Sequence, residues 1–417
     1  MDKAKTLSGP FPEPPTFPLT PKELRLELGR RNSDGNESPP PVNSLPANEA
    51  DSSKPLAQRL LSLDALRGFI MFWIVGGEDI VHALHKISSS GWADLLARQM
   101  DHKKWEGVAF YDLIFPSFVF IVGVSLVFSL SRTIADCGRA PAYKRILSRS
   151  LLLYLLGIFY YGGFAGGFEK VRLLGVLQRI ALCYLFAGLI FCTFRLRGMI
   201  ACCAALLLGY WALMTFVPVP GVGAGNFDEG KNLANYIDRE YLPLFRWDGD
   251  HDPEGLLSTL PAIANCLLGV FAGLLLRNAG IGAQKKVLYL LIGGVASVVL
   301  GFFWGWQFPV VKKIWTSSYV LVAAGYSSVF LALFYQVIEL WNVRQWAMPF
   351  VWIGVNPITI YMAHNLIDFP KVAHRFAGGP IKEMFGAYGD VVITSVVILM
   401  TFAIVRFLYR RKIFLRL

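Results

Sequence analysis

Long apolar runs recur along most of this chain and are separated by short polar segments. Each run approaches the ~20 residues that an α-helix needs to cross a bilayer. In lipid every backbone amide needs a partner within its own segment, so repeated runs of this length predict helices rather than open sheets. We therefore predict an all-α, polytopic transmembrane helix bundle with about ten spans, near residues 62–85, 108–131, 150–167, 173–194, 199–217, 256–276, 287–306, 317–340, 346–367 and 389–409.

Composition supports this class of protein. The 417 residues are 54% hydrophobic and only 17% charged, whereas a soluble domain carries about 25% charged residues. A large soluble all-α protein is thereby excluded. Residues 1–58 differ, because they are rich in Pro and Ser and lack the apolar run of a signal peptide. We predict a disordered cytoplasmic tail over 1–58 and a transmembrane domain over 59–417.

Lys and Arg near the span ends predict the orientation, because basic residues collect on the cytoplasmic side. The 132–149 loop and the Arg410-Arg411-Lys412 segment are strongly basic. Both termini are therefore predicted to be cytoplasmic, and the long 218–255 loop is predicted to lie on the outer side together with His102 and Lys312. The net charge of +11 mostly reflects this topology, since no nucleic-acid-binding motif is present.

His102 is the leading candidate for chemistry. It stands in the polar segment 101–107, just before an apolar run that carries Asp112. An imidazole exchanges protons near neutral pH, so at a membrane boundary it is suited to proton transfer. A solvated loop histidine is the alternative interpretation of the same position.

Polar residues inside the spans are the second set of candidates, because charge at membrane depth is costly and usually faces a bundle interior. Asp64 and Arg67 are three residues apart on one helical face, where a structural ion pair is an equal alternative. An arginine cannot lose its charge, so Arg179 needs an anion or several carbonyl groups as partners. Asn356 and His364 are expected on a common face about two turns apart. The full set is Asp64, Arg67, Glu78, Asp79, Asp112, Gln178, Arg179, Asn356 and His364.

The six cysteines do not form a metal or disulfide pattern. None stands in an outward loop, and no Cys-x-x-Cys pair or close His/Cys cluster occurs. We predict that they pack as small apolar residues and that the protein holds no metal.

Several motifs together resemble the heparan-α-glucosaminide N-acetyltransferase family and its bacterial relatives, in family order over about residues 60–417. They are Ser62-Leu63-Asp64-Ala65-Leu66-Arg67-Gly68-Phe69, His102-x-x-Trp105-x-Gly107 followed by Asp112, Lys170-Val171-Arg172-Leu173-Leu174-Gly175-Val176-Leu177-Gln178-Arg179, Tyr236-Ile237-Asp238-Arg239, Asp252-Pro253-Glu254-Gly255, Trp315-Thr316-Ser317-Ser318-Tyr319, and Gly354-Val355-Asn356-Pro357 with His364.

This resemblance implies transfer of an acetyl group from cytosolic acetyl-CoA to an amino sugar or glycan on the far side of the membrane. His102 corresponds to the family's active histidine and would act as general base or as an acetyl relay. Asp112 or Glu78 would orient the imidazole, and Asn356, His364 or Ser318 would donate to the oxyanion. Arg67 and Arg179 would bind CoA phosphates. The remaining candidate binding residues are Asp64, Asp79, Trp105, Gln178, Lys312 and Trp315.

The chain also departs from the family pattern. Glu78 stands where the family has an active-site asparagine, and Val311 precedes Lys312 where the family often has asparagine. Because polar groups near the histidine select the acceptor, heparan sulfate is not predicted as the substrate. The expected location is the bacterial inner membrane, with His102 facing the periplasm, because neither a signal peptide nor the lumenal domain of the animal enzymes is recognised.

Two alternatives remain for the function. A transporter or flippase of a glycan or lipid-linked substrate would use the same buried charges without covalent chemistry. A catalytically inactive membrane scaffold is the other. The predicted partners are acetyl-CoA, the acceptor and the lipid bilayer. Whether a second copy of the chain forms a homodimer stays open.

Overall fold

The computed structural model describes residues 60–88 and 90–414. The prediction of a disordered tail over 1–58 lies outside these residues. The described part is helical throughout, and its extended pairings are the isolated bridges Glu106–Val311 and Val219–Gly223. This confirms the predicted all-α class.

The long helices are α5 (Ile114–Cys137), α6 (Arg139–Tyr160), α7 (Val176–Thr193), α8 (Leu196–Phe216), α10 (Thr259–Arg277), α11 (Ala283–Gly305), α12 (Ser317–Tyr335) and α17 (Gly389–Arg410). The shorter helices are α2 (Leu61–Phe72), α3 (Glu78–Ile87), α4 (Gly91–Met100), α9 (Leu233–Tyr241), α13 (Met348–Gly354), α14 (Pro357–Leu366), α15 (Phe369–Ala377) and α16 (Pro380–Met384). Single turns of 3-10 or π-helix are η1 (Trp73–Gly77), η2 (Phe110–Leu113), η3 (Phe168–Lys170), η4 (Gln336–Leu340), η5 (Gln345–Ala347) and η6 (Gly386–Tyr388).

Seven helical segments of the described residues are long and apolar enough to cross a membrane. They cover residues 110–137, 176–193, 196–216, 259–277, 283–305, 317–340 and 386–410. Each of them coincides with one of the predicted spans. The chain is therefore a polytopic helical protein of membrane type.

The other three predicted spans have interrupted or displaced helices. In the 62–85 segment, Val75 and Gly76 leave the helical backbone conformation, and Gly76 has φ 138°. The predicted bounds 150–167 are wrong, because α6 begins at Arg139 and ends at Tyr160, before the glycine-rich turn. The 346–367 segment breaks between α13 and α14, where Asn356 is non-helical and precedes Pro357. A residue before proline is disfavoured in the α conformation, which accounts for that break.

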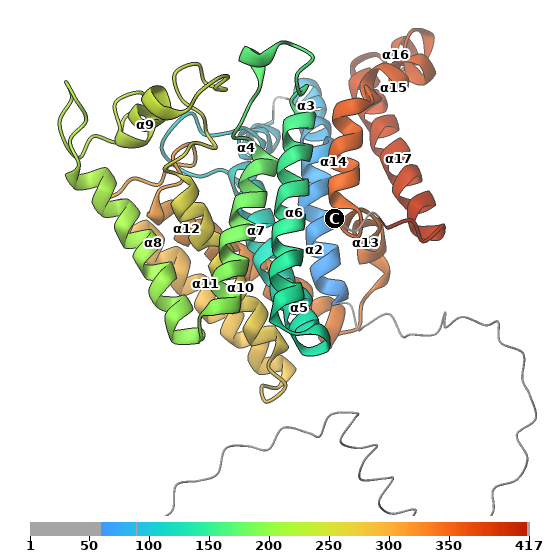
Figure 1. Cartoon of the computed structure of the whole chain (residues 1–417). Coiled ribbons are helices and arrows are strands. Elements are labelled where there is room, and N and C mark those ends of the chain that lie inside the picture. The colour runs from blue at the N-terminus through green and yellow to red at the C-terminus, as the bar shows by residue number, and fades with distance from the viewer. Residues whose placement is uncertain (1–59, 89, 415–417) are drawn as a thin grey trace, which may run out of the picture. The chain divides into compact units, whose positions relative to one another are not determined.

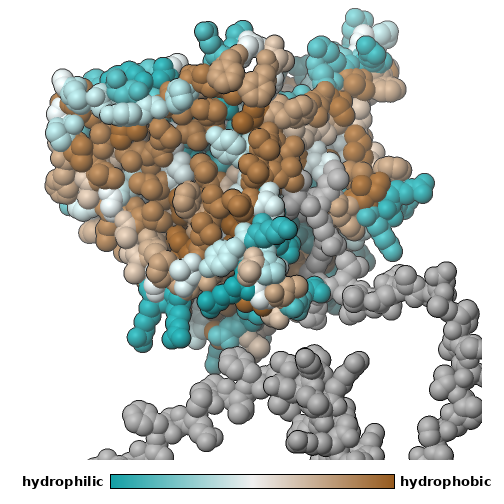
Figure 2. Space-filling model, in the orientation of Figure 1, coloured by the Kyte–Doolittle hydropathy of each residue, from teal (hydrophilic) through white to brown (hydrophobic). Residues whose placement is uncertain are grey.

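The long helices run side by side, and their connections gather at two ends (Figure 1). One end carries α4, α9, α15 and α16 together with the 101–109, 217–258 and 306–316 loops, and we call it the His102 end. On the face shown in Figure 2, apolar side chains cover the middle, and hydrophilic ones lie towards both ends. Such an apolar band between polar rims is the surface expected of a helix bundle in a bilayer.

Glycines allow the closest helix crossings. A Cβ atom at Gly68 would lie 1.7 Å from the carbonyl oxygen of Phe350, and one at Gly354 would lie 1.8 Å from that of Asp64, so α2 and α13 touch through their backbones. A Cβ atom at Gly123 would lie 2.0 Å from the Cys266 oxygen, between α5 and α10. Without a hydrophobic force between helices in lipid, such close packing is a main source of helix association.

Candidate active site

The loop that carries His102 is joined to the loop that carries Lys312. Gly107 N donates to Val310 O at 2.9 Å, and Glu106 pairs with Val311 as an isolated bridge. Gly107 has φ 102°, a conformation that favours glycine. This short backbone pairing brings together two side chains that are 210 residues apart in the sequence.

His102, Asp112 and Lys312 form a compact cluster at the His102 end. His102 Nδ1 lies 2.8 Å from Asp112 Oδ1, and Lys312 Nζ lies 3.2 Å from the same oxygen. Lys312 Nζ is also 2.9 Å from His102 Nδ1 and 3.4 Å from Nε2. The His102 side chain is 55% exposed, whereas that of Asp112 is fully buried. The imidazole is therefore accessible to a substrate while its carboxylate partner is not.

Hydrogen bonds hold both the side chain and the backbone carbonyl of Asp112 in place. Its Oδ2 accepts hydrogen bonds from Lys103 N at 3.2 Å and Ala109 N at 3.0 Å. Tyr319 donates its hydroxyl to the Asp112 carbonyl at 2.7 Å. A carboxylate held in this way can accept the Nδ1–H of the imidazole and leave Nε2 as the basic nitrogen, as in catalytic triads. In that tautomer Lys312 Nζ donates to Asp112 Oδ1 and not to Nδ1.

Lys312 supplies a positive charge beside the imidazole. Burial lowers the pKa of its ammonium group, and the nearby Asp112 carboxylate opposes this change. An ammonium that is poorly solvated interacts strongly with any negative charge that forms next to it.

The cluster opens into a cavity of about 670 Å³, which is within the range of small-molecule sites. Its walls are His102, Lys103, Tyr160, Tyr161, Arg172, Val176, Trp247, Asp248, Pro253, Glu254, Lys312, Lys313, Trp315, Tyr361 and Asn365. Aromatic rings and charged groups of both signs thus face the same space.

Arg172 holds together the charged part of the cavity wall. Its guanidinium binds Asp252 through two hydrogen bonds of 2.9 and 2.6 Å and binds Glu254 at 2.6 Å. It also lies against the rings of Tyr161 and Trp247, at 4.5 and 4.9 Å from their centroids. The hydrogen bonds and charges of the two carboxylates raise the pKa of Arg172, so the guanidinium keeps its charge in this wall.

Arg179 lies behind this wall and is 1% exposed. It donates to Gly255 O at 3.1 Å and to Ser258 Oγ at 2.5 Å, and its guanidinium lies 5.0 Å from the Trp315 ring centroid. Its Nε and Nη1 make no hydrogen bond to any of the residues that the structure describes. Gln178, the neighbouring candidate residue, donates to Arg172 O at 3.1 Å.

Of the other predicted residues, Trp315 lines the cavity. Trp105 is not part of its lining and donates to Phe227 O at 3.0 Å. Glu78 reaches the site indirectly, because it is hydrogen-bonded to Tyr111. The Tyr111 ring lies 4.8 Å from that of His102. Asp79 is exposed beside Glu78 on α3.

The structure does not bring the remaining candidates to this cavity. Arg67 binds Asp64 at 2.9 Å, Gly354 O at 3.0 Å and Ser125 Oγ at 2.6 Å within the helix bundle. Ser318 donates to Phe308 O at 2.6 Å.

The ninth predicted span supplies two more of these remote residues. Asn356 donates to Ile413 O at 3.0 Å. His364 pairs with Thr401 at 3.0 Å and stacks on Phe369, away from His102.

Sequence reasoning missed several cavity residues: Tyr160, Tyr361, Lys313 and the charged wall formed by Arg172 and Glu254. A signal existed for the last two, since both stand in motifs that carried the family resemblance. No such signal existed for the two tyrosines, because they come from helices α6 and α14, and the sequence does not show that these helices lie close together.

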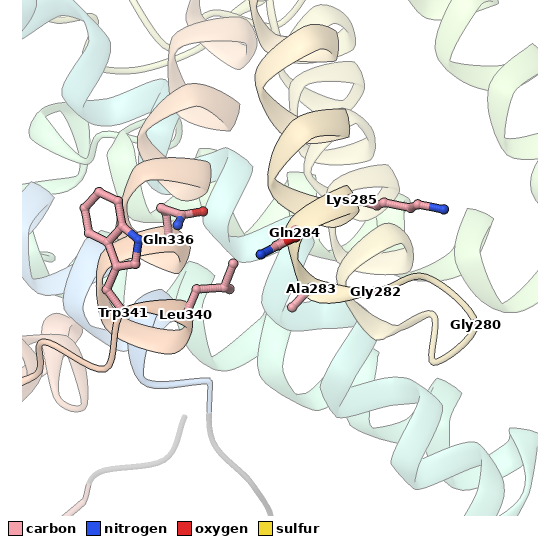
Figure 3. A pocket seen from close by; sticks show the side chains of 8 residues that line it. All are labelled: Gly280, Gly282, Ala283, Gln284, Lys285, Gln336, Leu340 and Trp341. Atoms are coloured by element: carbon pink, nitrogen blue, oxygen red, sulfur yellow. The ribbon is translucent and has the colours of Figure 1, made fainter.

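A second cavity of about 580 Å³ lies between the start of α11 and the end of α12. Gln284 comes from the first turn of α11, whereas Gln336, Leu340 and Trp341 come from η4 and the residue after it, and Lys285 points away from them (Figure 3). It contains no predicted site residue.

The helix bundle and the His102 cavity define the class of this molecule, an integral membrane protein with a candidate acid–base site at one end. Comparison with known proteins gives the family. The model of the heparan-alpha-glucosaminide N-acetyltransferase catalytic region matches residues 59–288, and the chain belongs to that family.

Two relatives are similar over most of the described residues. The heparan-alpha-glucosaminide N-acetyltransferase of Homo sapiens is 28% identical over 379 residues, covering 75% of this chain and 55% of the relative. That of Mus musculus is 29% identical over 332 residues, covering 64% of this chain and 49% of the relative. The chain thus spans about half the length of these relatives.

Proposed function

We propose that this protein is a membrane acetyltransferase that moves the acetyl group of acetyl-CoA to an amino sugar or glycan. The observation that carries the proposal is the His102–Asp112–Lys312 cluster, which opens into a cavity. His102 and Asp112 lie inside the segment matched by the family's catalytic region, and Lys312 lies beyond it. Two curated relatives bear the name of an N-acetyltransferase that acts on a glucosaminide.

The reaction requires a base. The sugar nitrogen attacks the thioester carbonyl carbon, the carbon–sulfur bond breaks, and the amine proton must leave. With Nδ1–H donated to Asp112, His102 Nε2 would accept that proton and return it to the departing sulfur, so the products are an N-acetyl sugar and CoA thiol. General base catalysis of this kind contributes about 10²–10⁴-fold.

In a relay mechanism Nε2 would attack the thioester carbonyl carbon first, the carbon–sulfur bond would break, and CoA would leave as the thiolate. The sugar nitrogen would then attack the acetyl-imidazole and release His102, and the amine proton would pass to the thiolate, so the products are again an N-acetyl sugar and CoA thiol. Both routes place the negative charge of the tetrahedral intermediate near Lys312 Nζ, which lies 3.4 Å from Nε2. We assign Lys312 to stabilise that charge. Trp247, which is 58% exposed, and Tyr161 provide aromatic faces for a sugar ring.

For the topology, we propose ten membrane crossings, both termini in the cytoplasm, and the His102 end on the opposite side. Segments 62–85 and 346–367 would each cross as a pair of short helices. Segment 139–160 would cross as one helix whose first turns are basic. In a bacterial inner membrane, the location expected from the sequence, this places His102 in the periplasm. A membrane-impermeant thiol reagent would label Asp101→Cys in intact cells under this topology, whereas a protected thiol would contradict it.

The experiment that tests the function is transfer from radiolabelled acetyl-CoA in purified, detergent-solubilised full-length protein, over a panel of amino sugars and glycans. We expect label on an acceptor with wild type and a loss of about 10²–10⁴-fold with His102→Gln. His85→Gln is the matched control, because His85 is an exposed histidine at the same end of the bundle.

Near-normal transfer by His102→Gln would contradict the assigned base. A protein that transfers nothing and does not bind acetyl-CoA in calorimetry would contradict the acetyltransferase and favour a transporter.

A further inference from the structure

A cluster of three ligand-type side chains lies beside the mouth of the His102 cavity. Glu229 comes from the loop before α9, and Asp248 and His251 come from the loop after it. The ligand atoms of all three lie within 4.8 Å of one another. We propose that this cluster binds a divalent cation of the zinc type, independently of acetyl transfer.

The buried nitrogen of His251 points to a ligand. Its side chain is 4% exposed, and Nε2 makes no hydrogen bond in the described structure. Nε2 lies 3.5 Å from Asp248 Oδ2 and 3.8 Å from Glu229 Oε1, which is too far for hydrogen bonds. Ligand atoms around a tetrahedral zinc ion, at about 2.0–2.1 Å from the metal, are roughly 3.3 Å from one another. The observed spacing therefore matches a metal site better than a hydrogen-bonded one.

His251 also has the orientation of a metal ligand. Its Nδ1 lies 2.6 Å from Asp250 Oδ1, so the carboxylate accepts the Nδ1–H and leaves the Nε2 lone pair directed at the cluster. Metal-binding histidines usually carry such a carboxylate on the second nitrogen, which fixes their tautomer. Asp248 N donates to His251 O at 3.1 Å, and this tight turn holds two of the ligands in place.

Lys313 is the competitor for this site. Its Nζ lies 2.6 Å from Glu229 Oε1 and 3.0 Å from Asp248 Oδ2, the same two oxygens that would bind the cation. The ammonium group and a metal ion therefore exclude each other. Since Lys313 and Asp248 both line the cavity and Lys313 follows Lys312, cation binding would displace Lys313 at the rim of the active site.

The chemical class of the ion follows from the ligands. One imidazole and two carboxylates suit Zn²⁺ and its neighbours in the first transition row, whereas Mg²⁺ and Ca²⁺ prefer oxygen ligands throughout. The sequence predicted no metal because the ligands are spread over residues 229–251 without a close pair of His or Cys.

The test uses the full-length protein in detergent, treated with chelator and titrated with Zn²⁺ by calorimetry, with Co²⁺ absorption as a spectroscopic report of coordination. We expect one Zn²⁺ per chain, no competition by Mg²⁺ or Ca²⁺, and affinity at least about tenfold weaker in Glu229→Gln. Lys313→Gln removes the competitor and should bind Zn²⁺ several-fold more tightly. Both side chains are partly exposed, so these variants are expected to fold.

Asp228→Asn is the matched control, because Asp228 is an exposed carboxylate next to Glu229 and forms an ion pair with Lys231. Its Zn²⁺ affinity should equal that of wild type. Absence of Zn²⁺ binding in both wild type and Lys313→Gln would overturn the proposal. Binding that is unchanged in Glu229→Gln would also overturn it, since the ion would then sit elsewhere, for example at the exposed His82 or His85.

Discussion

Replacing Asp112 with asparagine keeps the His102 side chain but changes which of its ring nitrogens carries the proton. The Asp112 side chain is fully buried and uses Oδ1 for His102 and Lys312 and Oδ2 for two backbone N–H groups. An asparagine of the same shape has one oxygen and one NH₂ group. It must present its oxygen either to the imidazole or to the backbone.

The backbone decides this choice. Turning the NH₂ group towards Lys103 N and Ala109 N would leave two N–H groups without an acceptor, at a cost of about 1–3 kcal/mol each. The asparagine oxygen is therefore expected to stay on the backbone, and its NH₂ group then donates to His102 Nδ1. Lys312 loses its acceptor at this position, and its ammonium, which is 21% exposed, turns to water. The proton of the imidazole moves to Nε2, which can no longer act as a base. We expect kcat to fall about 10²–10⁴-fold with little change in KM.

The assay is acetyl transfer from labelled acetyl-CoA under saturating conditions. ¹⁵N chemical shifts of the imidazole report the tautomer without any turnover, and comparison with His102→Gln identifies the His102 signals among the six histidines. Asp101→Asn serves as the control, because Asp101 is a neighbouring carboxylate with a 64% exposed side chain. A rate within tenfold of wild type, or an Nδ1–H tautomer retained in Asp112→Asn, would refute the reasoning.

Three further changes test the packing and the charged wall. Gly354→Ala places a Cβ atom 1.8 Å from Asp64 O, so α2 and α13 must separate, and we expect a loss of about 1–3 kcal/mol in the free energy of unfolding. Arg172→Met leaves Asp252 buried and unpaired and should cost about 3–5 kcal/mol, seen as a large fall in Tm. Burial raises the pKa of Asp238 from its ordinary 3.8 to about 6. The folded state therefore holds that proton more tightly than the unfolded one, and stability falls as pH rises from about 4 to 6, by about 3 kcal/mol, a dependence that Asp238→Asn should lack.

Each of these changes has a matched control measured by thermal unfolding in detergent. Gly209→Ala adds a Cβ atom to a helix where nothing lies within 4 Å, and it should leave Tm unchanged. Arg239→Met and Asp228→Asn alter charges that are exposed. Equal Tm values for Gly354→Ala and Gly209→Ala, or for Arg172→Met and Arg239→Met, would contradict the packing argument. A pH profile of Asp238→Asn that parallels wild type would contradict the raised pKa.

The helices themselves were largely predictable. Seven of the predicted spans coincide with long apolar helices, because hydropathy over about 20 residues is a local property of the chain. The failures occur where local conformation interrupts the apolar run. The break at Asn356 carries a sequence signal in Pro357, whereas the kink at Val75 and Gly76 has only a glycine pair. The start of α6 was missed because Lys144, Arg145 and Arg149 lie within the helix.

The sequence by itself determined the class of protein and the family, since these depend on hydropathy and on motif order. It also named His102 and Asp112 as candidates, and these two residues, ten positions apart, do lie in contact. Only the tertiary structure decided which distant side chains share the site. Lys312 meets His102 through a backbone pairing of two loops, whereas His364 turns to Thr401 on α17. The physical reason is that helix packing and loop pairing, rather than spacing along the chain, set the distances between polar groups of different helices.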